Sequence, residues 1–125
     1  MLGKCNIVAL VGATDLDRAK IFYKDKLGLR FVRRDNFAIV FDVNGIMLRI
    51  SRVEKVTAAA YTVLGWNVPD IFGMIAHLAK HDVVFERFPY LQQDKLGIWI
   101  SPDKTMVAWF KDLDGNILSL TQLPS

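Results

Sequence analysis

The sequence contains few of the residues that disulfide, zinc and thiol chemistry require. Its 125 residues include one cysteine, Cys5, two histidines, and two glutamates at positions 54 and 86. A single cysteine excludes an internal disulfide framework and any zinc site built from cysteines. A catalytic thiol needs a base partner, and no histidine is placed to serve Cys5. We therefore interpret Cys5 as a small structural residue.

Long apolar runs are also missing. The longest uncharged apolar stretches, residues 5–14 and 56–69, are too short or too broken for a membrane span, which needs about 20 apolar residues. The chain does not start with a basic segment, an apolar run and a small-residue cleavage site. We therefore expect a cytoplasmic protein with no membrane partner.

No long run of charge of one sign is present. Sixteen Lys and Arg residues stand against thirteen Asp and Glu residues, giving a net charge of +3. Basic residues alternate with acidic ones, as in residues 24–26, and only Arg33 and Arg34 stand together. A nucleic-acid surface needs a clustered basic stripe. The pattern predicts a mixed-charge surface and no nucleic-acid partner.

What the sequence does contain is enough apolar mass for a folded core, 52% of its residues against 23% charged. In the first half, Asn6–Val11 is an apolar run short enough for a buried strand. Thr14 or Asp15 can cap a helix that ends at Gly28. Strand-like segments separated by turn-forming residues follow at Leu29–Arg33, Phe37–Phe41 and Ile46–Ser51.

The second half repeats this order. Thr62–Val68 is an apolar strand candidate, and Pro69-Asp70 begins a helix with an apolar stripe that includes Ile71, Ile75 and Leu78. A longer loop, Pro89–Leu96, interrupts the strands that follow. The predicted strands after the helix are Val83–Phe88, Gly97–Ser101, Thr105–Lys111 and Ile117–Gln122.

The closest internal match is the last hairpin of each half. Residues 42–50 and 112–120 both begin with Asp-x-(Asn/Asp)-Gly and have the same number of residues to the final apolar pair. We therefore predict one α+β domain of two tandem βαβββ modules, residues 4–52 and 61–123, joined by a linker at 53–60. The alternative is a plain mixed α+β domain without duplication.

Two motifs carry a family resemblance over essentially the whole chain. They are the helix-to-Leu-Gly segment at residues 15–29 and the Asp-x-Asp-Gly-Asn turn at residues 112–116. Together they resemble the vicinal-oxygen-chelate superfamily, which includes glyoxalase I, extradiol dioxygenases and the bleomycin and fosfomycin resistance proteins. The resemblance implies paired βαβββ modules, curved mixed sheets around a cavity that binds a small molecule, and a homodimer.

Metal enzymes of this family place His, Gln or Glu at the inward positions of the first and last strand of each module. Carried over by spacing, these positions correspond here to Val8 (or Asn6 in a shifted register), Arg49, Val63 and Ser119. Valine has no donor atom, arginine is a permanent cation, and a serine hydroxyl is a weak ligand. The family fold is therefore expected without its metal, and no cofactor is predicted.

Arg49 is the candidate anion anchor. Strand alternation puts Met47, Arg49 and Ser51 on one face and Leu48 and Ile50 on the other. If the second face packs on the helix, Arg49 faces the cavity, where a guanidinium binds a carboxylate or phosphate with two parallel hydrogen bonds. The alternatives are a structural ion pair with a nearby aspartate, or a register that exposes Arg49.

Aromatic residues are more numerous than a small core requires. Pairing across the Pro102 turn is expected to place Trp99 opposite Met106, and alternation then puts Phe110 on the same face as Ser119. Such a wall suits a flat or apolar ligand. The expected cavity residues are Arg49, Ser119, Trp99, Met106, Phe110, Val8 and Val63.

Two further features have ordinary structural interpretations. His77 and His81 stand four residues apart on the second helix but away from its apolar stripe, which is typical of a solvated face. The loop at residues 90–96 is a candidate lid that would bring Tyr90 or Asp94 to a ligand, or a surface excursion.

The sequence therefore favours a metal-independent, glyoxalase-like protein that binds a small aromatic or anionic molecule, for sequestration, resistance or sensing. The alternative is a metal-dependent lyase, isomerase or dioxygenase of the same fold. That enzyme would need at least three of six scattered side chains to converge: Asn6, Glu54, Glu86, Asp94, His77 and His81. A structural or regulatory module acting through a dimer surface is a third possibility.

Overall fold

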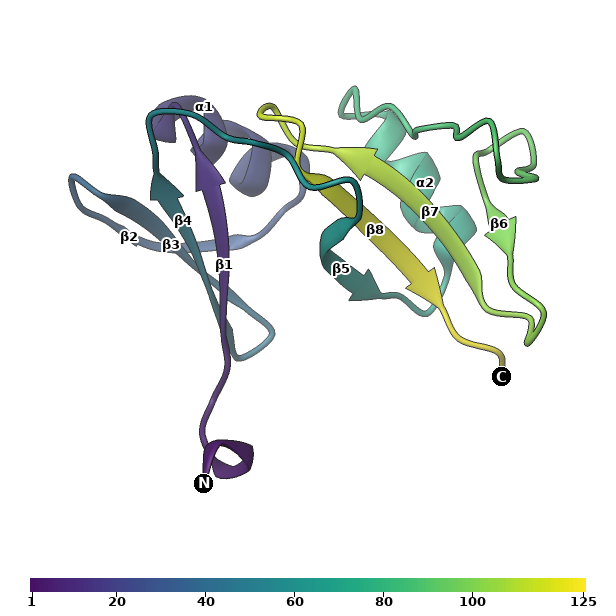
Figure 1. The fold of residues 1–125 in the computed structure, drawn as a ribbon, viewed down its shortest axis with the longest axis horizontal. Coiled ribbons are helices and arrows are strands. Elements are labelled where there is room, and N and C mark those ends of the chain that lie inside the picture. Colours follow the sequence, from purple (N-terminus) through teal and green to yellow (C-terminus); the bar gives the residue numbers. More distant parts are fainter. The chain divides into compact units, whose positions relative to one another are not determined.

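A computed structural model describes residues 1–125 as two compact units, Met1–Thr57 and Ala58–Ser125. The division falls within the segment 53–60 that was expected to link two modules. Each unit contains one mixed four-stranded sheet with a helix on one face (Figure 1). None of the helices has the length and apolar character of a membrane span.

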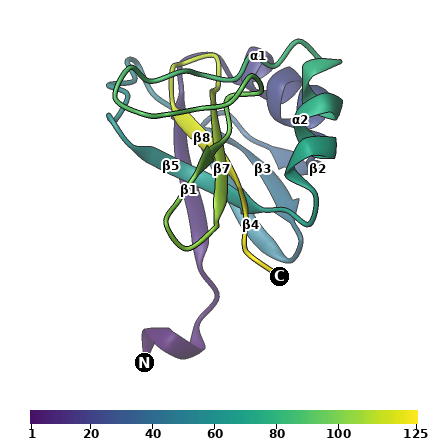
Figure 2. The same cartoon turned by 90° about the vertical axis from the view of Figure 1, so that its right-hand side faces the viewer.

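The first unit contains the strand order β1-β4-β3-β2, in which β1 runs parallel to β4 and the other pairs are antiparallel. A short 3-10 helix, η1 (Leu2–Lys4), lies at the end of an exposed N-terminal segment that extends away from this sheet (Figure 2). The pairing of β1 with β4 begins at Val8, whose partner is Met47, so the first strand starts at Val8 rather than at Asn6. The strands are β1 (Val8–Ala13), β2 (Arg30–Arg34), β3 (Ala38–Val43) and β4 (Ile46–Arg52).

The predicted helix is present and has the predicted ends. The Asp15 carboxylate accepts hydrogen bonds from the amides of Asp17 and Arg18 at 3.0 and 3.1 Å, which caps α1 (Leu16–Lys20). The chain continues as a π-helical segment, η2 (Ile21–Lys26), and turns at Gly28 with φ +73°. A positive φ suits glycine, because it has no Cβ to clash with the backbone.

In the first sheet, β4 buries the side chains of one face and leaves those of the other face more exposed. Leu48 and Ile50 of β4 are 1% and 0% exposed, whereas Met47 is 41% exposed. The helix packs against β3 and β4 on the buried face, where Tyr23 contacts Phe41 with ring centroids 6.2 Å apart. The predicted alternation along β4 is therefore confirmed, and Arg49 lies on the open face.

The second unit has the strand order β5-β8-β7-β6, with β5 parallel to β8. The Asp70 carboxylate caps α2 (Ile71–Ala79) by accepting from the amide of Gly73 at 3.1 Å. The buried residues of α2 are Ile71, Ile75 and Leu78, which place this helix against β8. The strands are β5 (Thr62–Asn67), β6 (Trp99–Ile100), β7 (Met106–Lys111) and β8 (Ile117–Gln122).

The predicted strand at Val83–Phe88 is wrong. Only an isolated bridge joins Phe85 to Phe110, and the Glu86 amide donates to the Trp109 carbonyl at 2.7 Å. Because β8 occupies one edge of β7, this segment and β6 share the other edge, one at each end. The second sheet therefore keeps four strands, as the first does.

The predicted register of the last strands is also wrong by one residue. Three residues lie between Ser101 and Thr105, whose backbone hydrogen bond of 2.9 Å closes the turn, so Trp99 pairs with Val107 and not with Met106. A shift of one residue moves side chains to the opposite face. Met106 and Phe110 accordingly lie on the face covered by α2, not on the face of Trp99 and Ser119.

Candidate functional site

The open face of the second sheet carries both tryptophans of the C-terminal strands. Trp109 pairs with Ser119, and Ser119 pairs with Gly65, so these three residues lie side by side across β7, β8 and β5. Trp99 lies two positions along on the same face, because its partner Val107 is two residues from Trp109. The face is therefore aromatic at the β6–β7 side and small at its centre.

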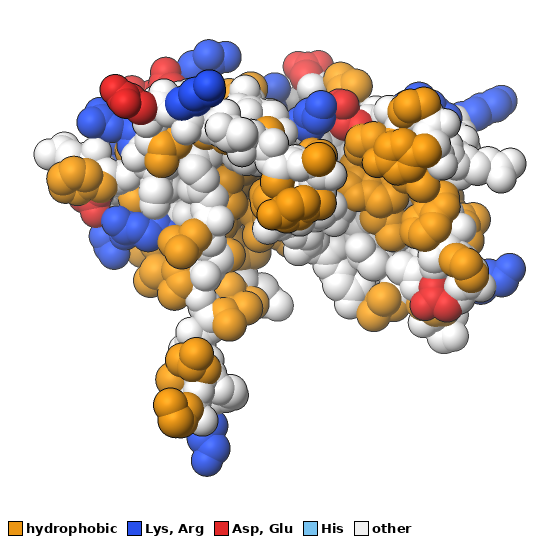
Figure 3. All heavy atoms as spheres, viewed as in Figure 1, with side chains coloured by type: hydrophobic (Ala, Val, Ile, Leu, Met, Phe, Trp, Pro, Cys, Tyr) orange, Lys and Arg blue, Asp and Glu red, His pale blue; other side chains and the backbone are white.

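Aromatic side chains line a cavity of about 360 Å³ on this face. The Trp99 and Trp109 ring centroids are 6.3 Å apart, and Phe88 meets Trp109 edge to face at 5.5 Å. Figure 3 shows hydrophobic side chains gathered over β7 of the second unit. The lining residues of this aromatic pocket are Ala60, Tyr61, Thr62, Phe88, Tyr90, Leu91, Trp99, Trp109 and Ile117.

Hydrogen bonds hold the pocket walls in place. The Trp109 indole donates from Nε1 to Thr62 Oγ1 at 3.1 Å, which ties β7 to β5 across β8. The loop after α2 is fastened by Gln93, whose amide nitrogen donates to the carbonyls of Glu86 and Gly97 at 3.0 and 2.8 Å. Gln93 Oε1 accepts from the Phe88 amide at 2.8 Å. The loop is thus an internally bonded wall that presents Phe88 and Tyr90.

Of the two loop residues considered as ligand contacts, one reaches the pocket. Tyr90 lines it and is 77% exposed, so its ring is free to meet a ligand. Asp94 instead accepts hydrogen bonds from the amides of Leu96 and Ile98, both at 2.9 Å, and so shapes the loop itself.

Ser119 and Val63 lie on the second sheet but do not line the aromatic pocket. Ser119 is 6% exposed, and Val63 is 39% exposed at a register shift between β5 and β8. A Cβ on Gly65 would lie 2.6 Å from Ser119 Oγ, closer than real contacts allow. Glycine at position 65 therefore lets β5 pair beside this serine.

This close approach predicts a coupled pair of substitutions. We expect Gly65→Ala to lower the free energy of unfolding by about 1–3 kcal/mol through overpacking. Added to Ser119→Ala, the same change should be milder, because the hydroxyl that clashes is gone. Urea unfolding of the four proteins measures the coupling, and Gly3→Ala, with open space around it, is the control. Equal effects of Gly65→Ala in both backgrounds would contradict the clash.

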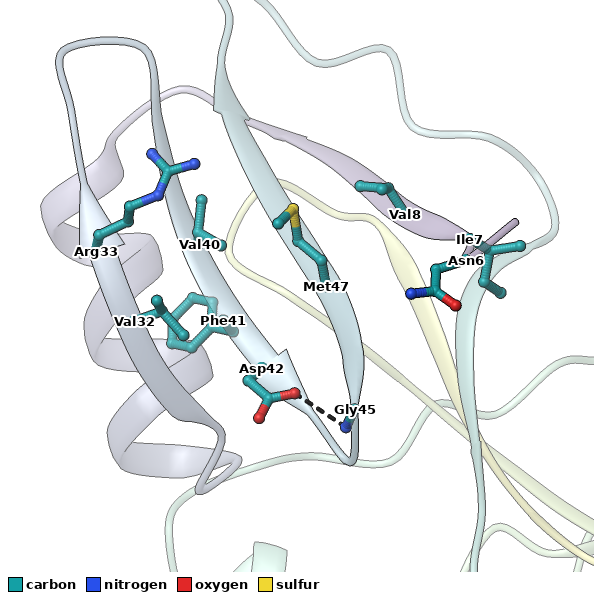
Figure 4. A pocket seen from close by; sticks show the side chains of 10 residues that line it. All are labelled: Asn6, Ile7, Val8, Val32, Arg33, Val40, Phe41, Asp42, Gly45 and Met47. Atoms are coloured by element: carbon teal, nitrogen blue, oxygen red, sulfur yellow. Dashed lines mark hydrogen bonds between the residues drawn. The ribbon is translucent and has the colours of Figure 1, made fainter. Parts of the chain in front are cut away.

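The first unit contains a second, open cavity of about 340 Å³ (Figure 4). At its floor, Val8 of β1 pairs with Met47 of β4, and Val40 lies on β3, diagonally across from Met47. Its charged members are paired, Arg33 with Asp35 at 3.6 Å and Asp42 with Arg30 at 2.8 Å. The lining residues are Asn6, Ile7, Val8, Val32, Arg33, Val40, Phe41, Asp42, Gly45 and Met47.

Arg49 lies next to this cavity without lining it. It is half-buried and pairs with Val40 on one side and Leu10 on the other, both on the open face. It makes no ion pair within 4.0 Å, whereas Arg30, Arg33 and Arg34 each do. The alternative of a direct structural ion pair with an aspartate is therefore not what the structure contains.

Asp35, in the β2–β3 turn, interacts electrostatically with Arg49. The amides of Phe37 and Ala38 donate to Asp35 Oδ1 at 2.7 and 2.9 Å and hold the pKa of this carboxyl below its ordinary value of 3.8. The positive charges of Arg49 and Arg33 lower this pKa as well.

This lowered pKa predicts an acid-dependent contribution to stability. A carboxyl whose pKa is lower in the folded state stabilises the fold above its unfolded pKa, and the contribution is lost as the pH falls below 3.8 toward the folded pKa. We therefore expect Asp35→Asn to lower the melting temperature at pH 7 and to reduce the loss of melting temperature between about pH 4 and about pH 2. Parallel melting curves over this pH range test the expectation, and identical pH profiles would contradict it.

Neither unit contains a group of three or more His, Cys, Asp or Glu side chains placed to hold a metal ion. The four positions at which spacing predicts the family's ligands carry Val8, Arg49, Val63 and Ser119, whose side chains do not fit a divalent metal. His77 and His81 are exposed on α2 with ring centroids 5.1 Å apart, and Cys5 is exposed in the N-terminal segment.

Sequence reasoning missed Trp109, Phe88 and Tyr61 as members of one pocket. The signal for Trp109 was available, because the odd number of residues in the Ser101–Thr105 turn fixes which face of β7 it occupies. Phe88 and Tyr61 come from irregular segments, whose position no periodicity predicts.

Comparison with known proteins identifies the family. The sequence model of the Glyoxalase/Bleomycin resistance protein/Dioxygenase superfamily matches residues 6–120. The chain belongs to this superfamily. The resemblance to the vicinal-oxygen-chelate family is confirmed, as is the predicted fold of two modules with curved mixed sheets. The sheets are not closed into barrels. A search of curated proteins gives no match.

Solved structures of this superfamily have the same fold at low sequence identity. A glyoxalase/bleomycin resistance protein/dioxygenase from Alicyclobacillus acidocaldarius is 19% identical with a TM-score of 0.74, covering 98% of this chain and 93% of that one. The bleomycin resistance determinant encoded on transposon Tn5 is 17% identical with a TM-score of 0.75, covering 96% and 98%. The fosfomycin resistance protein FosX from Listeria monocytogenes is 12% identical with a TM-score of 0.72, covering 94% and 92%.

Proposed function

We propose that this superfamily member binds a small organic molecule without a metal ion, and that it acts by sequestering or sensing that molecule. The observation that carries the proposal is the aromatic pocket, where Trp99, Trp109, Phe88, Tyr90 and Tyr61 surround one cavity. Exposed aromatic surface of this kind gains free energy when an apolar or flat ligand removes it from water. The Tn5 determinant, which has the same fold, is by name a bleomycin resistance protein, and this favours a protective role for the present chain.

The absence of suitable metal ligands supports the metal-independent part of the proposal. A divalent metal held as a Lewis acid needs imidazole or carboxylate donors that converge. The corresponding positions offer two valines, one arginine and one serine. A metal-dependent enzyme of the same fold would need donors from other elements.

Metal content and ligand response together test this proposal. Protein purified without chelator is expected to contain less than about a tenth of an equivalent of divalent metal, measured by mass spectrometry. Naphthoate, a flat aromatic anion, is expected to raise the melting temperature by roughly 10 °C at about 100 times its Kd. Stoichiometric metal that stabilises the fold, or no response to any aromatic compound, would overturn the proposal.

We propose that Arg49 is an anion anchor on the open face of the first sheet. A half-buried guanidinium without a carboxylate partner favours an anionic group, which it can bind through two parallel hydrogen bonds. The arginines of β2 are less suited to this role, because aspartates already neutralise them.

Substitution of Arg49 tests the anchor. We expect Arg49→Ala to weaken the binding of inorganic phosphate, measured by titration calorimetry, by about tenfold, the effect of losing one charge-assisted contact of about 1.5–3 kcal/mol in partial exposure. Naphthoate, which probes the aromatic pocket of the second unit, should bind both proteins equally. Arg30→Ala is the matched control, since Arg30 is exposed and paired with Asp42. Equal phosphate affinity for the wild type and Arg49→Ala would show that Arg49 does not bind the anion.

We further propose that the chain forms a homodimer. β1 is an edge strand of the first sheet. Two of its side chains, Val8 and Leu10, and the preceding Ile7 are apolar and exposed, with exposed fractions of 48%, 65% and 69%. Large exposed apolar patches are typical of protein interfaces. Light scattering on the purified chain measures the mass, and a monomer at micromolar concentration would contradict a stable dimer.

A further inference from the structure

The rings of the aromatic pocket form two walls that meet near a right angle. Trp99 and Trp109 make one wall, with an interplanar angle of 39°. Phe88 and Tyr90 make the other, with an angle of 33° and centroids 5.7 Å apart. Phe88 meets Trp109 at 86°. We name these four residues the aromatic corner.

The shape of the aromatic corner discriminates between kinds of apolar group. A flat ring stacks on one wall and meets the other only with its edge. A compact tetrahedral group, such as trimethylammonium, contacts both walls at once, because its methyl groups point in several directions. The corner therefore offers more contact to a compact group than to a plane of the same size.

The charge of the pocket discriminates further. None of its nine lining residues is charged, so no lysine or arginine repels a cation and no carboxylate selects a hydrated ammonium. The indole N–H of Trp109 already donates a hydrogen bond to Thr62. Trp109 therefore offers its ring and not its N–H to a ligand in the pocket. Five of the nine lining residues are aromatic, and the faces of aromatic rings carry the negative part of the ring quadrupole, which attracts cations.

We infer that the aromatic corner binds the quaternary or methylated ammonium group of a small organic molecule. Such a group cannot use hydrogen-bond acceptors fully and is weakly hydrated, so aromatic faces suit it better than carboxylates do. The inference rests on the proposed function, because it names the chemical group that the same pocket receives. The Lys20 ammonium over Phe31 at 4.0 Å shows a contact of this type within the first unit.

A pair of probes of equal shape tests the inference. Choline contains a trimethylammonium group, and neohexanol replaces its nitrogen by carbon and so removes the charge alone. We expect choline to bind about five to thirty times more tightly than neohexanol, the range for a cation on several rings. Quenching of tryptophan fluorescence in the intact chain measures both affinities. Equal affinities, or tighter neohexanol binding, would overturn the inference.

Variants locate the bound cation. Phe88→Leu and Tyr90→Leu each remove a ring from the second wall and should reduce the preference for choline over neohexanol at least about threefold. Trp66→Leu is the matched control, because Trp66 stacks on Phe110 at the α2 face, 6.4 Å away. Tyr90 is exposed, so its substitution leaves the fold intact. A preference unchanged in both wall variants would place the cation elsewhere.

The same titrations separate this inference from the proposed function. If naphthoate binds in the pocket and choline does not, the ammonium inference fails and the small-molecule pocket stands. If naphthoate, choline and neohexanol all fail to bind, the proposed function fails with it.

Discussion

Phe110→Ala is expected to lower the free energy of unfolding of the second unit by about 3–5 kcal/mol, the cost of truncating a fully buried phenylalanine. Phe110 is 1% exposed, stacks on Trp66 at 6.4 Å with an interplanar angle of 18°, and contacts Phe85 at 5.5 Å. The substitution removes transfer free energy and leaves a cavity that the strand backbones cannot collapse to fill. It also removes the ring at the bridge that joins Phe85 to β7.

Urea unfolding followed by circular dichroism measures this loss. Phe37→Ala is the matched control, because it makes the same substitution at a side chain that is 72% exposed, where we expect a change within about 0.5 kcal/mol. A loss below about 1 kcal/mol for Phe110→Ala would mean that this ring lies outside the core. Such a result would favour the sequence prediction that Phe110 shares a face with Ser119, which the pairing of Trp109 with Ser119 contradicts.

Trp109→Leu is expected to weaken naphthoate binding by about thirtyfold, equivalent to about 2 kcal/mol for a central aromatic anchor. Trp109 lies between Phe88 and Trp99 in the pocket and is the ring that both contact. Leucine removes the aromatic face and also the indole donor to Thr62, so the wall loses both its surface and its fixed position.

Isothermal titration calorimetry of the folded variant measures this effect, with Trp66→Leu as the control on the other face of the same sheet. The two substitutions make the same chemical change but should affect different quantities. Trp66→Leu should lower the free energy of unfolding and leave naphthoate affinity unchanged, whereas Trp109→Leu should mainly lower naphthoate affinity. Equal binding losses in both variants would mean that ligand affinity follows overall stability and not the pocket.

Local signals predicted most of the fold. Asp15 and Asp70 cap the helices as their side chains require, and Gly28 ends the first helical segment with a positive φ. The two Asp-x-(Asn/Asp)-Gly turns close equivalent hairpins at Gly45 and Gly115, which also have positive φ. Helix caps and glycine turns depend on residues close in sequence, so a short sequence motif is enough to predict each of them.

The errors arose where pairing between distant segments decided the outcome. Val83–Phe88 has the composition of a strand, but β7 offers a single free edge, and β6 occupies part of it. The face of Met106 and Phe110 depended on one residue of register. Because side chains of a strand alternate between its two faces, an error of one residue assigned side chains on the helix-covered face to the pocket face.

The candidate site shows the same division. The alternation along β4 placed Arg49 on the open face directly, because Leu48 and Ile50 had to be buried. The aromatic pocket could not be found in this way, since Phe88 is carried by a loop that Gln93 fastens through three hydrogen bonds.

The sequence by itself determined the two successive modules, the superfamily and the helix ends. Only the tertiary structure decided which aromatic rings share one cavity and which are core. The physical reason is that burial and periodicity are properties of single elements, whereas a pocket is made by side chains that strand register and loop hydrogen bonds bring together.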